Sequence, residues 1–450
     1  MLQRVLIANR GEIAVRIIRA CKQIGIETVA VYSTADRDSL HVQIADQAVC
    51  IGEAHASKSY LNMENIISAA ITTGAEAIHP GFGFLSENAQ FAKLCESCGI
   101  RFIGPKSEII KKMGDKAEAK RLMIEAGVPV VPGSIGEVTL EEGQKIIKEI
   151  GLPVLIKASA GGGGRGMRIV REERDFEALY RAAKQEAANA FKHDGVYIEK
   201  LIIDPLHIEV QVIGDKYGNI VHLGERDCSI QRRNQKVIEE APSRLDDELR
   251  QKMFDAAVKA AEYVKYENAG TIEFIVKDNA FYFIEMNTRI QVEHPVTEMI
   301  TGIDIVREQL RVAGGKPLRF KQDEVTFNGH AIEVRLNAED PKKDFMPSPG
   351  NITLLHVPNG LGIRFDSMLY TDYEMPPYYD SMMGKLIVHG FSRLDAIRKM
   401  RVMLEEMIVE GVPTNQNFLT MILMHSEFVK GNIDTGFIAK HIKELLNYET

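Results

Sequence analysis

The sequence predicts a multidomain protein that mixes α/β and α+β architecture, and three observations support this prediction. The chain has 450 residues, which at about 150 residues per domain corresponds to roughly three domains. The first hundred residues alternate short apolar strands with amphipathic helices, the pattern of a doubly wound parallel sheet. Strand patterns dominate 207–222 and 270–293, and short strands with Pro/Gly turns follow residue 329. The later domains should therefore be mixed.

The expected first domain covers residues 1–112. An apolar strand over 4–8 runs into a helix that Gly11 opens and Gly25 ends. The apolar residues of that helix recur on one face, so it should pack against the sheet. The other elements expected here are strands at 28–32, 48–51, 77–79 and 101–103, with a helix over 62–73.

A second domain is expected over 113–329 and a third over 330–450. A helix over 115–126 and a proline-marked segment at 128–133 open the second domain. A compact lid-like subdomain of about 131–203 follows, and its expected elements are strands at 153–159, 167–171 and 196–201 with a helix over 173–191. The third domain is expected to carry a helix over 393–410.

Composition and charge exclude several classes of protein. The 55 basic and 63 acidic residues give a net charge of −8, so there is no basic excess for nucleic acid. No uncharged apolar run reaches the roughly 18 residues of a membrane span, and MLQRVLIANRG does not fit a signal peptide. We therefore expect a cytoplasmic protein. Cys95 and Cys98 form a C-x-x-C with no second pair, which predicts two buried small side chains rather than a zinc site.

A glycine cluster, Gly161 to Gly166, follows the predicted strand at 153–159. It is not a G-x-x-x-x-G-K-[ST] loop, and an extended segment rather than a helix comes after it. A glycine-rich hairpin tip lets backbone N–H groups wrap a phosphate, and Lys157 is placed to reach one. The alternative is a disordered surface hairpin. The first turn after a strand has only Gly11 where G-x-G-x-x-G needs three glycines, which disfavours NAD despite Asp36.

A row of polar residues alternates with apolar ones between Glu285 and Glu293. In an extended chain alternate side chains share a face, so the row would line one cleft. Because it would span roughly 26 Å, it must serve neighbouring subsites or bend. Glu273 would face Glu285 across a hairpin with a three-residue loop, whereas a two-residue loop would put them on opposite faces. If they pair, they form with Asn287 an oxygen site for Mg²⁺. The alternative is a solvated polar face.

Two further polar stretches lie upstream of this row. His207, Glu209 and Gln211 alternate with apolar residues in the same way. The charge-dense stretch 225–236 lies between predicted strands, and a stretch of this kind is usually a solvated loop.

Seven segments, in chain order, resemble the motifs of biotin carboxylase, the ATP-grasp subunit or domain of biotin-dependent carboxylases. They are IANRGEIAVRIIRA from Ile7, HPGFGFLSEN from His79, GDKAEAK from Gly114, KASAGGGGRGM from Lys157, ERDCSIQRR from Glu225, EMNTRIQVEHPVTE from Glu285 and YYDSMMGKL from Tyr378. The resemblance covers essentially the whole chain, and the EMNTRIQVEH block is highly specific.

This resemblance implies a fold and a reaction. The fold is a Rossmann-like N-terminal domain, a central ATP-grasp domain with a mobile lid and a mixed C-terminal domain. In the reaction, ATP phosphorylates bicarbonate to carboxyphosphate, which breaks down to CO₂ and carboxylates biotin on a carrier protein. The cofactors implied are ATP and Mg²⁺ or Mn²⁺, with carrier-bound biotin as substrate.

The resemblance also implies roles for individual residues. The ATP-binding set is Lys116, Lys157, Gly161, Gly162, Gly163, Gly164, Gly166, Glu199, Lys200, Ile202, His207, Gln231, Glu273 and Glu285. The metal ligands are Glu273, Glu285 and Asn287. The bicarbonate set is Lys236, Arg289, Gln291 and the Val292 backbone. Glu293 matches the base that deprotonates bicarbonate, Arg335 matches the group that stabilises the biotin enolate, and Phe82 lies near biotin. Lys236, Arg289, Glu293 and Arg335 form the catalytic set.

Two positions depart from the pattern expected of the biotin carboxylase family. Phe82 stands where Tyr is common, and Asn234 stands where His is common.

No A-M-K-M biotinyl motif occurs, so the biotin carboxyl carrier protein and the carboxyltransferase are expected on separate chains. A homodimer is expected, with Arg19 and Arg364 at its interface. The leading hypothesis is the biotin carboxylase of an acetyl-CoA or acyl-CoA carboxylase in fatty-acid synthesis; the alternatives are another ATP-grasp carboxylate ligase and a non-catalytic nucleotide-binding protein.

Overall fold

The computed structural model describes residues 2–159, 167–191 and 193–448. Its N-terminal part is a parallel five-stranded sheet in the order β3-β2-β1-β4-β5. The strands are β1 (Arg4–Ile7), β2 (Glu27–Ser33), β3 (Gln47–Gly52), β4 (Ala77–His79) and β5 (Arg101–Phe102). The helices between them are α1 (Gly11–Gln23), α2 (Leu40–Ile44), α3 (Met63–Thr73) and α4 (Ala89–Ser97). The predicted doubly wound α/β class of this part is confirmed.

Helix α1 packs its apolar face against the N-terminal sheet. Ile13, Ile17 and Ile18 are fully buried in one cluster with Val5 and Ile7 of β1. Gly25 adopts a φ of +73°, which permits the sharp stop that the sequence predicts. Helix α1 therefore ends where the chain turns back into β2.

An eight-stranded sheet forms the centre of the molecule, in the order β13-β12-β9-β10-β11-β14-β21-β19. Its strands are β9 (Leu206–Gly214), β10 (Ile220–Arg232), β11 (Gln235–Ala241), β12 (Asn268–Lys277), β13 (Ala280–Asn287), β14 (His330–Asn337), β19 (Ile363–Ser367) and β21 (Met382–Gly390). All neighbouring strands are antiparallel, and β11 pairs with β14 from Ile238↔Val334 to Ala241↔Ala331. The sheet therefore runs without interruption across residue 330.

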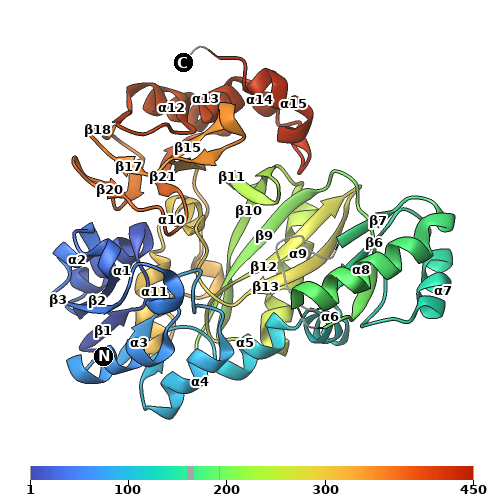
Figure 1. Ribbon diagram of the computed structural model, residues 1–450, viewed down its shortest axis with the longest axis horizontal. Coiled ribbons are helices and arrows are strands. Elements are labelled where there is room, and N and C mark those ends of the chain that lie inside the picture. The colour runs from blue at the N-terminus through green and yellow to red at the C-terminus, as the bar shows by residue number, and fades with distance from the viewer. Residues whose placement is uncertain (1, 160–166, 192, 449–450) are drawn as a thin grey trace.

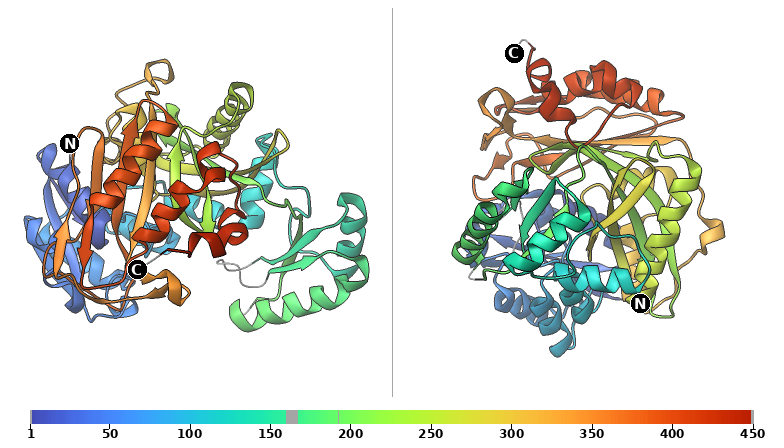
Figure 2. Two further views of the ribbon diagram at one scale, coloured as in Figure 1. Left: turned by 90° about the horizontal axis from the view of Figure 1, so that it is seen from above. Right: turned by 90° about the vertical axis from the view of Figure 1, so that its right-hand side faces the viewer.

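The lid-like subdomain predicted between 131 and 203 contains its own small sheet, in the order β7-β6-β8. Its elements are α7 (Leu140–Ile150), β6 (Val154–Ala158), β7 (Met167–Val170), α8 (Phe176–Phe191) and β8 (Val196–Lys200). Ile147, Ile156, Phe176 and Ile198 form a separate apolar cluster inside it. Figure 1 and the left view of Figure 2 show it projecting from the rest of the molecule.

The remaining helices connect or cover these sheets. They are α5 (Ser107–Gly114), α6 (Lys116–Glu125), α9 (Asp247–Tyr263), α10 (His294–Thr301) and α11 (Ile305–Ala313). Helix α9 packs against β9 and β10, and its buried residues, including Met253 and Ala257, share an apolar cluster with residues of β9 and β12.

The C-terminal region adds helices and two-stranded pairs to the β14–β19 end of the large sheet, at the top of Figure 1. The helices are α12 (Arg393–Glu406), α13 (Gln416–Met424), α14 (Ser426–Lys430) and α15 (Phe437–Leu445). The pairs are β15 (Glu339–Asp340) with β16 (Met346–Pro347), β17 (Gly350–Asn351) with β20 (Glu374–Met375), and β18 (Leu354–His356) with β22 (Ile408–Glu410). Across the described residues, no helix is both long and apolar enough to span a membrane.

Two local predictions were wrong. The helix expected over 393–410 ends at Glu406, because Met407 is extended and the β-branched Ile408 and Val409 pair with β18. Cys95 is buried as expected, but Cys98 is exposed, because α4 ends at Ser97 and Cys98 is its C-cap.

Candidate active site

The hairpin of β12 and β13 brings Glu273 opposite Glu285, although not by the loop that the sequence analysis required. Lys277 pairs with Ala280, so the turn has two residues, Asp278 and Asn279, both with positive φ. Such a turn alone would place the two glutamates on opposite faces. A β-bulge at Ile284 inserts one extra residue, after which Glu273 pairs with Glu285. The predicted pair of carboxylates is present because the bulge restores the register.

The polar row after Glu285 bends rather than continuing as a strand. Strand β13 ends at Asn287, and Glu293 is the N-cap of α10. Because of the bend, side chains of the row reach Glu273. Glu273 Oε1 accepts hydrogen bonds from Asn287 Nδ2 at 2.8 Å and from Gln291 Nε2 at 2.7 Å. An extended chain through Glu293 would have spread these groups along the cleft. The bend instead brings two of them, Asn287 and Gln291, to one carboxylate.

Lys236 on β11 lies among three carboxylates. Its Nζ donates to Glu209 Oε2 at 2.6 Å, to Glu273 Oε1 at 3.0 Å and to Glu293 Oε1 at 2.6 Å. Burial alone would lower the pKa of Lys236, but the three carboxylates raise it well above its usual value. Lys236 is therefore a permanent cation.

Glu293 is held as a carboxylate. Its Oε1 accepts from Lys236, and its Oε2 accepts from Arg335 Nη2 at 3.0 Å. Burial opposes ionisation, but Lys236 and Arg335 hold the pKa of Glu293 well below its usual range. Arg335 also donates from Nε to Glu239 Oε1 at 2.6 Å, and burial raises the pKa of Glu239 to about 7. Glu293 is thus deprotonated, and two cations neutralise it.

Arg289 lies beside this cluster but is held by a different partner. Its Nε donates to Glu87 Oε2 at 2.8 Å and its Nη2 donates to Asn287 Oδ1 at 2.9 Å. Glu87 comes from the N-terminal region and also accepts from the backbone N–H of Thr288. Glu87, which follows Ser86 in the HPGFGFLSEN segment, was not among the predicted site residues.

The most buried ionic pair of the cleft, Arg226 with Glu209, was also missed. Both side chains are fully buried, and Arg226 donates as well to Gln211 Oε1 at 2.7 Å and to Gln291 Oε1 at 2.8 Å. The charge-dense stretch was interpreted as a solvated loop, and this was wrong, because it forms β10 and its turn. The signal available in the sequence was the alternation of His207, Glu209 and Gln211 with apolar residues. This alternation places the three polar side chains on one face of β9, the face that Arg226 contacts.

Two residues predicted to bind the nucleotide, Lys157 and Glu199, lie on strands of the lid-like subdomain. Lys157 Nζ donates to Glu199 Oε2 at 2.6 Å, and Lys120 Nζ, which the sequence analysis missed, donates to Glu199 Oε1 at 3.2 Å. Burial opposes ionisation of Glu199, but the two ammonium groups lower its pKa. Lys200 is engaged elsewhere, because its Nζ donates to the carbonyls of Gly151 and Leu152.

Two other members of the predicted ATP set, His207 and Gln231, lie beside the Glu273 carboxylate. His207 Nε2 lies 2.8 Å from Glu273 Oε2, and Gln231 Nε2 lies 2.8 Å from His207 Nδ1. Since the Gln231 amide donates, the His207 proton is on Nε2 and is directed at Glu273. Ile202 is partly buried after β8, and Lys116 is exposed at the start of α6. Gly161, Gly162, Gly163, Gly164 and Gly166 lie outside the described residues.

The predicted metal ligands are arranged as an oxygen site. Glu273 is saturated by hydrogen bonds, whereas Glu285 accepts none from the residues that the structure describes. Burial and the neighbouring Glu273 carboxylate raise the pKa of Glu285. A divalent cation beside both carboxylates would remove this repulsion, and carboxylate and amide oxygens suit Mg²⁺. The residues therefore fit the ion.

The two positions that depart from the family pattern have structural surroundings of their own. Phe82 is partly buried at a cavity of about 150 Å³, which it lines with Asn9, Phe84 and Met382. Asn234 lies in the two-residue turn between β10 and β11 with a φ of +64°, a conformation that Asn adopts more easily than most residues.

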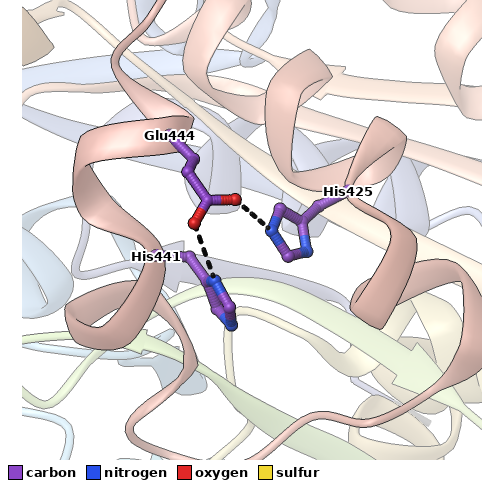
Figure 3. A group of neighbouring side chains, drawn as sticks. All are labelled: His425, His441 and Glu444. Atoms are coloured by element: carbon purple, nitrogen blue, oxygen red, sulfur yellow. Dashed lines mark hydrogen bonds and ion pairs between the residues drawn. The ribbon is translucent and has the colours of Figure 1, made fainter.

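A cluster outside the cleft also brings potential metal ligands together. His425, His441 and Glu444 lie between α14 and α15 (Figure 3). His425 Nε2 lies 3.1 Å from Glu444 Oε2, and His425 Nδ1 accepts the backbone N–H of Glu427 at 3.3 Å. The proton of a neutral His425 is therefore on Nε2, which would have to lose it to bind a metal. The cluster is a hydrogen-bonded contact between two helices.

Comparison with known proteins identifies the family. The profile of the biotin carboxylase N-terminal domain matches residues 1–110, and that of the biotin carboxylase C-terminal domain matches residues 333–440. Between them, residues 115–321 match the ATP-binding domain of the carbamoyl-phosphate synthase L chain. The chain belongs to the biotin carboxylase family. Biotin carboxylases are ATP-grasp ligases, so the chain is an enzyme of that class.

Individual biotin carboxylases match nearly the whole length of the chain. Biotin carboxylase of Nostoc sp. is 59% identical over 97% of this chain and 98% of its own length. Biotin carboxylase 1 of Bacillus subtilis is 56% identical over the same shares of the two chains. The biotin carboxylase domain dimer of Hydrogenobacter thermophilus 2-oxoglutarate carboxylase, solved with MgADP, ADP and bicarbonate, superposes with a TM-score of 0.94 at 52% identity and 100% coverage of both chains. These matches confirm the predicted biotin carboxylase fold with its central ATP-grasp domain.

Proposed function

We propose that this protein carboxylates biotin on a carrier protein, with bicarbonate as the carbon source and ATP as the phosphoryl donor. The observation that supports this most directly is Glu293, a buried carboxylate held between Lys236 and Arg335. The two cations would attract a small anion to a carboxylate that can accept its proton. The domains proposed for this chemistry are 1–112, 113–329 and 330–450, with the lid at about 131–203.

We assign bicarbonate to the space bounded by Lys236, Arg289, Gln291 and the backbone of Val292. Arg289 can present two parallel N–H groups to a planar anion. When an anion draws Lys236 and Arg335 away from Glu293, the pKa of Glu293 rises from its depressed value. Glu293 would therefore become a stronger base when its substrate is present.

We assign ATP to the cleft below the lid. Lys116, Lys157 and the glycines Gly161 to Gly166 would bind phosphates, and Glu199, Lys200, Ile202, His207 and Gln231 would line the nucleoside. Glu273, Glu285 and Asn287 would hold Mg²⁺ or Mn²⁺, which supplies charge neutralisation on the phosphates. Lys157 is paired with Glu199, so ATP would compete with Glu199 for this ammonium.

The deciding experiment measures ADP release by the purified protein with MgATP, varying bicarbonate and free biotin. We expect release to require bicarbonate and to rise with biotin. Bicarbonate-independent release would indicate another ATP-grasp carboxylate ligase, and ATP binding without turnover would indicate a nucleotide-binding protein.

We assign biotin to the side of the cleft occupied by Arg335 and Phe82. Arg335→Ala should lower biotin carboxylation at least tenfold more than bicarbonate-dependent ATP cleavage, because its guanidinium would stabilise the enolate that forms only on biotin. Both rates are measured on the same preparation. Arg393→Ala is the matched control, since Arg393 pairs with Glu240, the residue next to Glu239 on β11. Equal losses in both assays would contradict the assignment.

We further propose that the carboxyl group passes to an acyl-CoA, with acetyl-CoA first, on a separate carboxyltransferase chain, as in fatty-acid synthesis. The carrier would also be a separate chain. A cytoplasmic location is supported by five cysteines that are all free thiols. Reconstitution with carrier and carboxyltransferase subunits of acetyl-CoA and 2-oxoacid carboxylases would identify the acceptor.

We propose a homodimer, since the structure from H. thermophilus is described as a dimer. Arg16, Arg19, Glu298 and Arg364 line an open cavity of about 300 Å³. Leu361, three residues before Arg364, is 90% exposed. We place the interface between the two copies at this charged cavity and at Leu361.

Leu361→Asp should convert the dimer to a monomer in light scattering, because it would bury a charge at the interface. Ile71→Asp on α3, where Ile71 is also exposed, is the control that should leave the mass unchanged. If the Leu361→Asp protein remains a dimer, the interface lies elsewhere on the surface.

A further inference from the structure

Two backbone carbonyls flank Val292, and each is held by a buried side chain. Lys385 Nζ donates to the carbonyl of Val292 at 2.7 Å. His294 Nδ1 lies 2.8 Å from the carbonyl of Gln291. Because a peptide group is planar, fixing its carbonyl also fixes the N–H on its other side. The pair of contacts therefore sets the directions of the Val292 and Glu293 N–H groups.

Lys385 is an unusual residue for this purpose, because its side chain is completely buried. It lies on β21, in register with Arg335 of β14. Its Nζ is 3.1 Å from Glu12 Oε1, at the start of α1 in the N-terminal sheet region. A buried ammonium is costly unless it is paired and hydrogen-bonded. Lys385 thus connects three parts of the chain at the segment that carries Glu293.

His294 acts from the other side of the same segment. It is fully buried at the first position of α10. Burial, followed by the nearby charge of Lys385, lowers the pKa of His294 well below its usual value, so the ring is neutral. A neutral ring that meets a carbonyl through Nδ1 must carry its proton there. His294 is therefore a donor to Gln291, whose side chain binds Glu273 and Arg226.

Val292 itself is partly exposed between two buried neighbours, Gln291 and Glu293. Both carbonyls accept hydrogen bonds from protein donors, whereas the Val292 N–H donates to no residue that the structure describes. We propose that Lys385 and His294 are positioning residues that hold Val292 and Glu293 in the geometry that receives bicarbonate. This inference rests on the proposed function. Neither residue needs to touch the substrate, because each acts through a backbone carbonyl.

The test separates this role from general stability. Lys385→Met alone would leave Glu12 buried without its cation, so the informative variant is Glu12→Gln/Lys385→Met, compared with Glu12→Gln. Burial raises the pKa of Glu12 to about 7, so a neutral side chain is tolerated there. Glu12→Gln keeps the Lys385 contact with Val292 and is the matched control. His294→Phe removes the other contact without removing a charge.

We expect the double variant and His294→Phe to raise the KM for bicarbonate at least tenfold, because displacements of about 1 Å cost up to a hundredfold in rate. The KM for MgATP should stay within twofold of that of Glu12→Gln. Amide hydrogen exchange of residues 288–296 should quicken in both variants. Equal rises in both KM values, or a bicarbonate KM and exchange rate equal to those of Glu12→Gln, would overturn the inference.

Failure of the proposed function would be distinguishable from failure of this inference. If the unmodified protein shows no bicarbonate-dependent ATP cleavage, the proposed function fails. Hydrogen exchange still reports whether Lys385 and His294 hold the segment: faster exchange in the variants supports the positioning, and unchanged exchange overturns it.

Discussion

Glu293→Gln should reduce bicarbonate-dependent ADP release by about a hundredfold to ten-thousandfold, the range typical for loss of a general base. The glutamine keeps the shape of the side chain but cannot accept a proton from bicarbonate. ATP binding should change less than twofold, because neither Lys157 nor the Glu273–Glu285 pair touches Glu293. Single-turnover ADP formation and nucleotide titration of the same sample measure the two quantities.

A matched control for this prediction is Glu308→Gln. Glu308 is also a buried glutamate paired with an arginine, Arg319, but it lies on α11 outside the cleft. Its substitution should leave both quantities unchanged. If Glu293→Gln weakened ATP binding as much as ATP cleavage, the general-base role would be wrong.

Lys236→Met should abolish bicarbonate-dependent cleavage and also change the pH dependence of stability. Without the ammonium, Glu209, Glu273 and Glu293 repel one another, and the pKa of at least one rises. In the unmodified protein the pKa values of Glu273 and Glu293 are depressed, so their contribution to stability is complete above about pH 4.5 and is lost only as the pH falls through the depressed values. In the variant, folding takes up a proton, so stability falls as the pH rises through the raised pKa.

The difference in Tm between the two proteins should therefore widen from pH 5.5 to pH 8. Thermal unfolding at several pH values measures it. Lys440→Met is the control, since Lys440 also binds two carboxylates, Asp204 and Asp434, but at the surface. A difference in Tm that is constant with pH would contradict the proposed coupling between Lys236 and the carboxylates.

The sequence predicts the parts of this structure that depend on local pattern. The N-terminal strands and helices follow from apolar periodicity. The row of polar residues from Glu285 to Glu293 predicts an acidic cleft. The pairing of Glu273 with Glu285 could not be settled, because it depends on a bulge at Ile284 that neither turn residues nor alternation reveals. The role of Arg226 was hidden for another reason: a charged residue in a charge-dense stretch looks solvated until the strands that bury it are in place.

The uninterrupted sheet has a consequence for how the molecule comes apart. Strands β11 and β14 share a hydrogen-bonded ladder, so a cut at residue 329 would leave two open edges with unpaired N–H and C=O groups. Fragments 1–329 and 330–450 should therefore aggregate when produced alone and recover only when produced together. The lid-like subdomain has its own sheet and apolar cluster, so in calorimetry it can melt as a separate, earlier unit. What looks like three domains along the chain should thus behave as two cooperative units on heating.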